Sequence, residues 1–344
     1  MNGNPADTLP VLEVSHLEKS FSLEAGLFSA FGKFVHAVRD VSFSVGANSS
    51  LGLVGESGCG KTTTARLLVR MYTAGSGRVL FRSGGETLDV FSLKGEALKA
   101  YRRKVKYVFQ DPARSLNPRM RIFDVLTDGW RWSGLWPGKE KAREAAAAVL
   151  EEAGLSAGDL DRRPGEFSGG QRQRISIARG LLMEPELLIC DEVISALDVS
   201  IQGQILNLLL DLKEKRGLSF LFITHDLRAA GYFCDRIAVM YRGEILENAP
   251  ARDLYRTAVH PYTKMLFASA AGKENGTEDF VFSGERGAEI PGGGSARCLF
   301  AERCPYAAER CFREKPALRD LPAESAAQAH AVRCHLFSAG NGIR

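Results

Sequence analysis

Alternation of apolar and polar residues predicts strands in the first part of the chain. The alternation runs from Val11 to Leu17, and residues 41–45 and 50–56 have the composition of further β segments. Residues 78–82 and 105–110 add two more expected strands. We therefore expect the chain to open with a layer rich in β structure.

Helical periodicity and short apolar runs alternate in the middle of the chain. Apolar periodicity and charge spacing predict helices over residues 96–104, 139–155 and 171–185. Residues 187–192 and 218–224 are short and nearly all apolar, and a helix-like segment, 201–217, separates them. Such runs are typical of parallel strands buried on both faces, so the core is expected to be α/β.

Three further segments follow this core. Residues 236–249 predict a hairpin that turns at Arg242 and Gly243, and residues 261–270 predict a helix. Residues 272–294 contain seven glycines among mixed charges. That composition buries little apolar surface and is typical of a linker.

Composition and charge exclude several classes of protein. The 344 residues are 45% hydrophobic and 25% charged, which excludes fibrous, disordered and small disulfide-framework proteins. The 45 basic and 41 acidic residues leave a net charge of +4, too mild to indicate a nucleic-acid partner. No apolar run approaches the roughly 18 to 20 residues that span a bilayer, and the N-terminus lacks a signal-peptide pattern, so we expect a soluble chain that is not exported.

Residues 55–62 fit the phosphate-loop pattern G-x-x-x-x-G-K-[ST] and lie between an apolar strand and a helix. Glycines at these positions let backbone N–H groups turn inward on a phosphate chain. Lys61 is expected to bind the β- and γ-phosphates, and the Thr62 hydroxyl to hold Mg²⁺. The expected nucleotide-binding residues here are Gly55, Glu56, Ser57, Gly58, Cys59, Gly60, Lys61, Thr62 and Thr63.

Two further segments contain residues that could act on a nucleotide or its Mg²⁺ ion. Asp191 and Glu192 end a buried strand, where the first carboxylate suits Mg²⁺ and the second can orient or deprotonate an attacking water. A glycine pair opens a basic helix after Phe167 and can offer N–H groups and a hydroxyl to another phosphate. The candidate residues of this helix start are Ser168, Gly169, Gly170 and Gln171. On its own, this segment is better described as an N-capped surface helix.

The order of these motifs resembles the ATP-binding cassette (ABC) ATPase family over residues 11–249. The resemblance implies an α/β, ABC-type P-loop NTPase with a RecA-like core, an antiparallel β subdomain and an α-helical subdomain. It implies a nucleotide-binding domain over residues 1–271, with the helical subdomain at about 112–184. Residues 272–344 would then form a linker and a small Cys-rich C-terminal extension.

The resemblance also implies roles for single residues. Lys61, Gln110, Glu192 and His225 would form the catalytic set, with Gln110 also binding Mg²⁺ and connecting to the membrane partner. Residues 167–171 would be the signature motif, which in the family faces ATP on the opposite subunit, and residues 195–198 the loop at the dimer seam. Phe21 would stack on adenine, with Phe28, Phe31 and Phe34 as rivals.

Residues 109–122 and 259–269 resemble the oligopeptide/dipeptide branch of ABC importers, which also includes nickel and some oligosaccharide systems. The branch implies a subunit at the cytoplasmic face of the inner membrane. Its partners would be a second ABC ATPase subunit, commonly a different chain, two permeases and a separate substrate-binding protein. A soluble ABC ATPase acting on DNA or ribosomes is disfavoured because there is one cassette and no heptad run. A non-hydrolysing redox sensor is disfavoured because every catalytic position is occupied.

Four cysteines lie in the last 47 residues, and each directly follows an arginine: Cys298, Cys304, Cys311 and Cys334. The arginines are expected to favour thiolates, the form that binds metal. In the same importer branch such cysteines can ligate a 4Fe-4S cluster. Zinc, or cysteines that are reduced or disulfide-paired, remain alternatives. His330 and His335 could substitute as ligands, although ordinary packing or solvation is the favoured explanation of both. Cys59 is interpreted as oxidisable, and Cys190 and Cys234 as buried small residues.

Overall fold

A computed structural model of the chain describes residues 9–22, 34–271, 296–322 and 329–337. Its centre is an eight-stranded sheet in the order β11-β12-β10-β9-β3-β8-β7-β6. Five of these strands run parallel: β6 (Val105–Val108), β7 (Leu187–Asp191), β8 (Ser219–Thr224), β3 (Ser50–Val54) and β9 (Arg236–Tyr241). Every residue of β3, β7 and β8 is buried, which explains their apolar sequences.

A second, four-stranded sheet is antiparallel throughout, in the order β2-β1-β4-β5. Its strands are β1 (Leu12–Ser22), β2 (Phe34–Val45), β4 (Ser76–Ser83) and β5 (Glu86–Asp89). The expected opening β layer is therefore present. It packs with the start of the central sheet in one core that includes Val14, Phe81 and Leu53.

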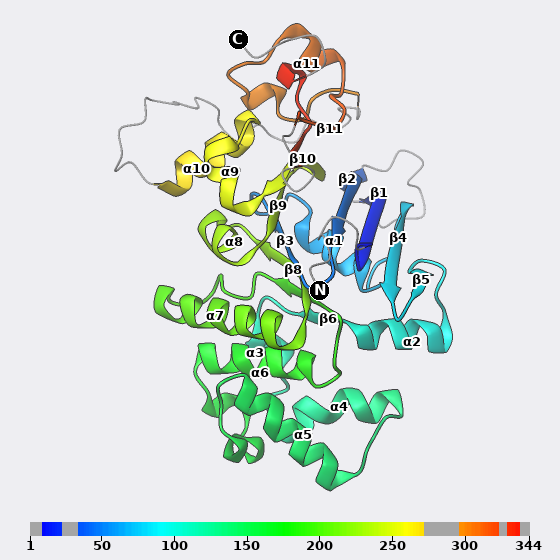
Figure 1. Cartoon of the computed structure of the whole chain (residues 1–344), viewed down its shortest axis with the longest axis vertical. Helices are drawn as coiled ribbons and strands as arrows, with labels where there is room; N and C mark the ends of the chain where they lie inside the picture. Colours follow the sequence, from blue (N-terminus) through cyan, green and yellow to red (C-terminus); the bar gives the residue numbers. More distant parts are fainter. Residues whose placement is uncertain (1–8, 23–33, 272–295, 323–328, 338–344) are drawn as a thin grey trace, which may run out of the picture.

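Helices connect the strands of the central sheet along the chain. Figure 1 shows α4–α6 gathered at one end of the long axis. The helices are α1 (Lys61–Leu68), α2 (Gly95–Lys104), α3 (Pro112–Ser115), α4 (Ile122–Ser133), α5 (Lys139–Glu152), α6 (Gly169–Leu181), α7 (Val199–Arg216), α8 (Leu227–Phe233), α9 (Ala251–Thr257) and α10 (Pro261–Ala271). Two 3-10 turns, η1 (Ala157–Asp161) and η2 (Pro164–Glu166), precede α6. A half-buried ion pair between Arg216 and Glu152 joins α7 to α5.

The cysteine-rich segment returns to the central sheet, at the opposite end from α4–α6 (Figure 1). It contains η3 (Ala301–Arg303), α11 (Glu309–Arg313), β11 (Arg319–Asp320), β12 (Ala331–Val332) and η5 (His335–Phe337). β12 pairs with β10 (Glu244–Pro250), the second strand of the expected hairpin. This extension of the sheet was not expected from the sequence. The expected linker, 272–294, lies outside the described residues.

Buried contacts fix this segment to the cassette. His330 Nε2 lies 2.7 Å from the fully buried carboxylate of Glu247 on β10. Arg333 is buried, and its Nη2 donates to Oδ2 of Asp40, a residue of β2, at 3.3 Å. Burial acts to raise the pKa of Asp40, but the hydrogen bond with His16 and the Arg333 and Lys315 charges outweigh it and hold that pKa below its ordinary value. Among the described residues, no helix is long and apolar enough to cross a membrane.

Candidate functional site: a nucleotide site and a cysteine cavity

The phosphate loop connects β3 to α1, as its motif predicts. Gly60 has φ +111°, and a Cβ atom there would lie 2.2 Å from the Ala37 carbonyl oxygen, so only glycine fits. Lys61 follows directly and is buried. Its Nζ donates to the carbonyl oxygens of Gly55, at 2.8 Å, and Glu56, at 3.0 Å. These bonds hold the ammonium group over the loop on which phosphates would bind.

Asp191 lies at the carboxyl end of β7 and faces the start of α1. Thr62 Oγ1 donates to Asp191 Oδ1 at 3.1 Å, and the Tyr107 hydroxyl donates to Asp191 Oδ2. Burial raises the pKa of Asp191, although both hydrogen bonds oppose the rise. Tyr107 was not identified from the sequence. The sequence feature that could have identified Tyr107 is its position on β6, the strand that pairs directly with β7.

Glu192 is brought together with two of the other three expected catalytic residues, Gln110 and His225. Gln110 Nε2 donates to Glu192 Oε2 at 3.0 Å, and His225 Nδ1 lies 3.6 Å from Glu192 Oε1. Glu192 has φ +49°, a left-handed conformation that is uncommon for a residue with a side chain. Such backbone conformations cluster at functional sites, where the surrounding structure maintains them.

The expected signature segment begins α6. Ser168 is its N-cap: Ser168 Oγ accepts from the Gln171 N–H at 3.3 Å, and Gln171 Oε1 accepts from the Ser168 N–H at 2.9 Å. Ser168, Gly169 and Gln171 are exposed. Leu197 and Ile201 lie beside the glycine pair, so the expected seam loop and this helix start share one surface. An N-capped helix start is found, as both interpretations of this sequence require.

The adenine platform stays a prediction. Phe21 packs edge-on against Tyr72, with ring centroids 5.4 Å apart, and Lys19 Nζ lies 5.1 Å from the Phe21 ring. Phe34 begins β2 and is 62% exposed. The other two rivals, Phe28 and Phe31, lie outside the described residues.

A groove of about 630 Å³, the lateral groove, opens beside Gln110 between the central sheet and the helices α4 and α6. Its lining includes Lys106, Gln110, Asp111, Val125, Asp128 and Arg179. Burial, together with the Arg179 and Arg103 charges, lowers the pKa of Lys106 to about 8. The groove therefore combines apolar surface with charged groups of both signs.

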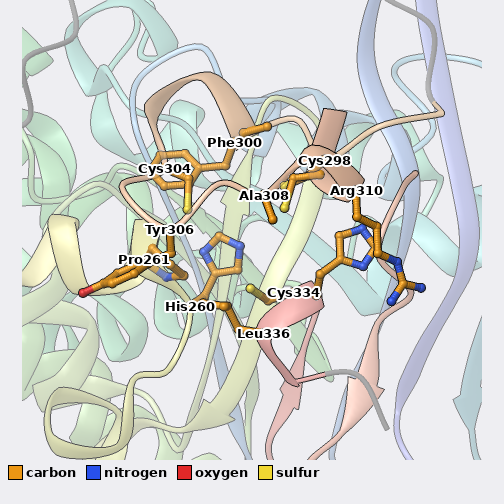
Figure 2. Close-up of a pocket in the computed structure, with 13 residues that line it drawn as sticks. His260, Pro261, Cys298, Phe300, Cys304, Tyr306, Ala308, Arg310, Cys334 and Leu336 are labelled. Carbon is orange, nitrogen blue, oxygen red and sulfur yellow. The ribbon is translucent and has the colours of Figure 1, made fainter. Parts of the chain in front are cut away.

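A second cavity, of about 130 Å³, is lined by Cys298, Cys304, Cys311 and Cys334. We call it the cysteine cavity. Figure 2 shows three of the thiols around the ring of His260, which lines the same cavity. Of the two candidate substitute ligands, His335 also lines this cavity, whereas His330 pairs with Glu247. Within the described ranges, no group of three or more His, Cys, Asp or Glu residues is arranged to hold a metal ion.

The expectation that arginines favour thiolates in this cavity is wrong. Each arginine pairs with a carboxylate instead: Arg297 with Glu302, Arg303 with Glu56, Arg310 with Glu314 and Arg333 with Asp40. Burial raises the pKa of Cys298 to about 11 and that of Cys334 to about 12. Burial therefore favours the neutral thiol at Cys298 and Cys334 when no metal is bound.

The three remaining cysteines are buried, and all seven cysteines are free thiols. Cys190 and Cys234 lie in the core, as expected. Desolvation by burial also raises the pKa of Cys59. Because a neutral thiol reacts slowly, the interpretation of Cys59 as an oxidisable residue is not supported.

Comparison with known proteins places this geometry in a family. The family described as ABC transporter matches residues 38–195, and the one described as oligopeptide/dipeptide transporter, C-terminal region, matches residues 246–311. A probable peptide ABC transporter ATP-binding protein of Sinorhizobium fredii is 42% identical over 326 residues, which cover 95% of this chain and 90% of the relative. The chain belongs to the ATP-binding proteins of the ABC transporters.

Two further similarities agree with this family. The oligopeptide transport ATP-binding protein AppF of Bacillus subtilis is 39% identical over 95% of this chain and 98% of its own. A dimeric post-hydrolysis structure of the ATP-binding cassette MJ0796, bound to ADP and Pi, superposes with a TM-score of 0.60 at 24% identity, over 70% of this chain and 99% of that one. The ABC cassette fold expected from the sequence is therefore confirmed. As an ABC ATPase, the chain binds and hydrolyses ATP.

Proposed function

We propose that this chain powers the import of peptides by hydrolysing ATP at a site built on Lys61, Asp191 and Glu192. The observation that carries the proposal is the convergence of three strand ends on one edge of the sheet. β3 leads into the phosphate loop, β7 ends at Asp191, and β8 ends just before His225. Relatives named as peptide or oligopeptide transport proteins, similar over nearly the whole chain, support the choice of cargo.

The geometry supports a division of labour among these residues. Glu192 would orient and deprotonate the attacking water, because its carboxylate is already held by Gln110 and faces His225. Thr62, Asp191 and Gln110 supply oxygen atoms, the ligands that suit Mg²⁺, and the first two lie 3.1 Å apart. The bound ion would neutralise phosphate charge. Lys61 would exchange its carbonyl partners for phosphate oxygens, and His225 would contact the γ-phosphate.

A complete site would need a second ATPase subunit. Ser168, Gly169 and Gln171 are exposed at the start of α6, whereas Lys61 Nζ donates to carbonyl oxygens of its own loop. An exposed helix N-terminus next to the residue 195–198 loop suits a phosphate held by a partner cassette.

The lateral groove is the proposed seat of a permease helix. It lies beside Gln110, so movement of that segment on ATP binding would reach a helix in the groove. Two permeases would hold this subunit at the cytoplasmic face of the inner membrane, and a separate extracytoplasmic substrate-binding protein would complete the importer.

Transport by the complete complex in proteoliposomes tests the proposed ATPase roles. Glu192→Gln should retain ATP binding, lose hydrolysis by at least about a hundredfold, and abolish peptide uptake. Lys61→Ala should lose ATP binding in addition to hydrolysis and uptake. Glu151→Gln, a neutralised glutamate on the exposed side of α5, is the matched control and should behave as the wild type. Uptake by the Glu192→Gln complex at the wild-type rate would contradict the proposal.

We further propose that the cysteine cavity holds a 4Fe-4S cluster. Four thiols from one short segment line one cavity, and the cluster takes one cysteine for each iron. Tetrahedral zinc on four cysteines is the alternative occupant, and metal analysis distinguishes the two. Such a cluster would supply either structural cross-linking or one-electron chemistry.

Metal analysis of anaerobically purified protein tests the cluster proposal. We expect a brown protein with about four iron and four sulfide per chain. Cys304→Ser should lower the iron content, and Cys234→Ser, a buried cysteine outside the cavity, should not. A colourless protein with one zinc per chain would contradict the cluster.

A further inference from the structure

Arg303 links the cysteine-rich segment directly to the phosphate loop. It ends η3, one residue before Cys304. Its Nη1 and Nη2 donate to the two carboxylate oxygens of Glu56 at 3.0 and 2.9 Å. The two residues are 247 positions apart in the sequence, and Glu56 lies inside the phosphate-loop motif. A two-pronged pair of this kind fixes the direction of the carboxylate as well as its distance.

Two aromatic rings also hold the Arg303 side chain in the position from which it binds Glu56. Its guanidinium lies 5.7 Å from the ring centroids of both Tyr241 and Phe300. Tyr262 packs against the same two rings, and its hydroxyl accepts from the Glu56 N–H at 3.0 Å. Both the backbone and the side chain of Glu56 are therefore fixed from outside the loop.

The charge of Glu56 gives this contact a consequence for nucleotide binding. The Glu56 carbonyl accepts from Lys61 Nζ, so this residue lies where the triphosphate is expected to bind. An uncompensated carboxylate beside the loop would repel the phosphates. Arg303 offsets that charge, because a guanidinium carries its positive charge at any physiological pH.

We propose that Arg303 is a positioning residue of the nucleotide site, which fixes Glu56 and offsets its charge. The cysteine-rich segment is then part of the ATP-binding machinery of its own subunit. This inference rests on the proposed role of the phosphate loop in binding ATP.

Equilibrium dialysis of the full chain against radiolabelled ATP with Mg²⁺ tests the proposal. The pair is partly exposed, so Arg303→Ala should raise the Kd by about three- to tenfold, equivalent to about 0.7 to 1.4 kcal/mol. In the assembled ATPase, the KM for ATP should rise by a similar factor while kcat changes less than about twofold. Arg303→Lys, which keeps the charge without the two-pronged geometry, should recover part of the loss.

Arg310→Ala is the matched control, because Arg310 also precedes a cavity cysteine but pairs with Glu314 on the same exposed turn. It should leave the Kd unchanged. Adding Glu56→Gln to Arg303→Ala should bring the Kd back toward the wild type, since the uncompensated charge is gone. If Arg303→Ala and Arg310→Ala both bind ATP as the wild type does, Arg303 is only a structural tether and the proposal is wrong. Wild-type protein that binds no ATP would instead contradict the proposed function.

Discussion

His260 makes the stability of this protein depend on pH in a way that the structure quantifies. The imidazole is buried, and its Nδ1 accepts from the Tyr262 N–H at 3.0 Å. A proton on Nδ1 would face that donor and break the bond. Burial accordingly lowers the pKa of His260 to about 4, and the nearby Glu247 carboxylate only partly opposes the shift.

The sign follows from comparing the folded and unfolded states. In the unfolded chain His260 titrates near its ordinary pKa of about 6.5, so below that pH the unfolded state binds a proton that the folded state does not. The free energy of unfolding therefore falls as the pH drops from about 6.5 towards 4. The loss from this one group is about 2 kcal/mol at pH 5 and about 3 kcal/mol below pH 4.

Urea unfolding at pH 7.5 and pH 5.0, for the wild type and His260→Asn, measures this loss. Asparagine can present an oxygen near the position of Nδ1 but does not titrate, so the other five histidines contribute equally to both proteins. We expect the wild type to lose about 2 kcal/mol more than the variant between the two pH values. An equal loss in both proteins, or a His260 NMR signal that titrates near pH 6.5, would refute the argument.

Three further substitutions test other parts of the structure. Tyr107→Phe removes the hydroxyl that donates to Asp191. Isothermal titration should show that the affinity for Mg²⁺ and ATP is weakened by about a few fold. An unchanged affinity would exclude a role for this hydrogen bond. Gly60→Ala places a methyl group 2.2 Å from the Ala37 carbonyl oxygen, so ATP binding should be lost by dialysis; normal binding would show that the loop can shift without cost. Phe300→Ala leaves a cavity between Tyr241 and Tyr262 and should lower the free energy of unfolding by about 3 to 5 kcal/mol, measured in urea; a loss below about 1 kcal/mol would mean that this cluster contributes little.

The sequence alone determined the parts of the site that depend on local pattern. A strand, a glycine-rich turn and a helix follow one another at residues 50–68, because backbone geometry there is set by neighbouring residues. The same holds for the buried strand that ends at Asp191 and for the N-cap at Ser168. Parallel strands bring their carboxyl ends to one edge, so the meeting of Glu192 with His225 also follows from the order of elements.

Only the tertiary structure decided which distant groups meet. The sequence places an arginine before each cavity cysteine, yet it does not show that Arg303 reaches Glu56 or that Arg333 reaches Asp40. Nor does periodicity show that two-residue strands after residue 318 join the central sheet, because so short a segment has no measurable period. These contacts depend on how the whole chain returns on itself. Which charges pair over long range depends on the distances that the fold creates between them. The residues that neighbour each charge in the sequence do not decide it.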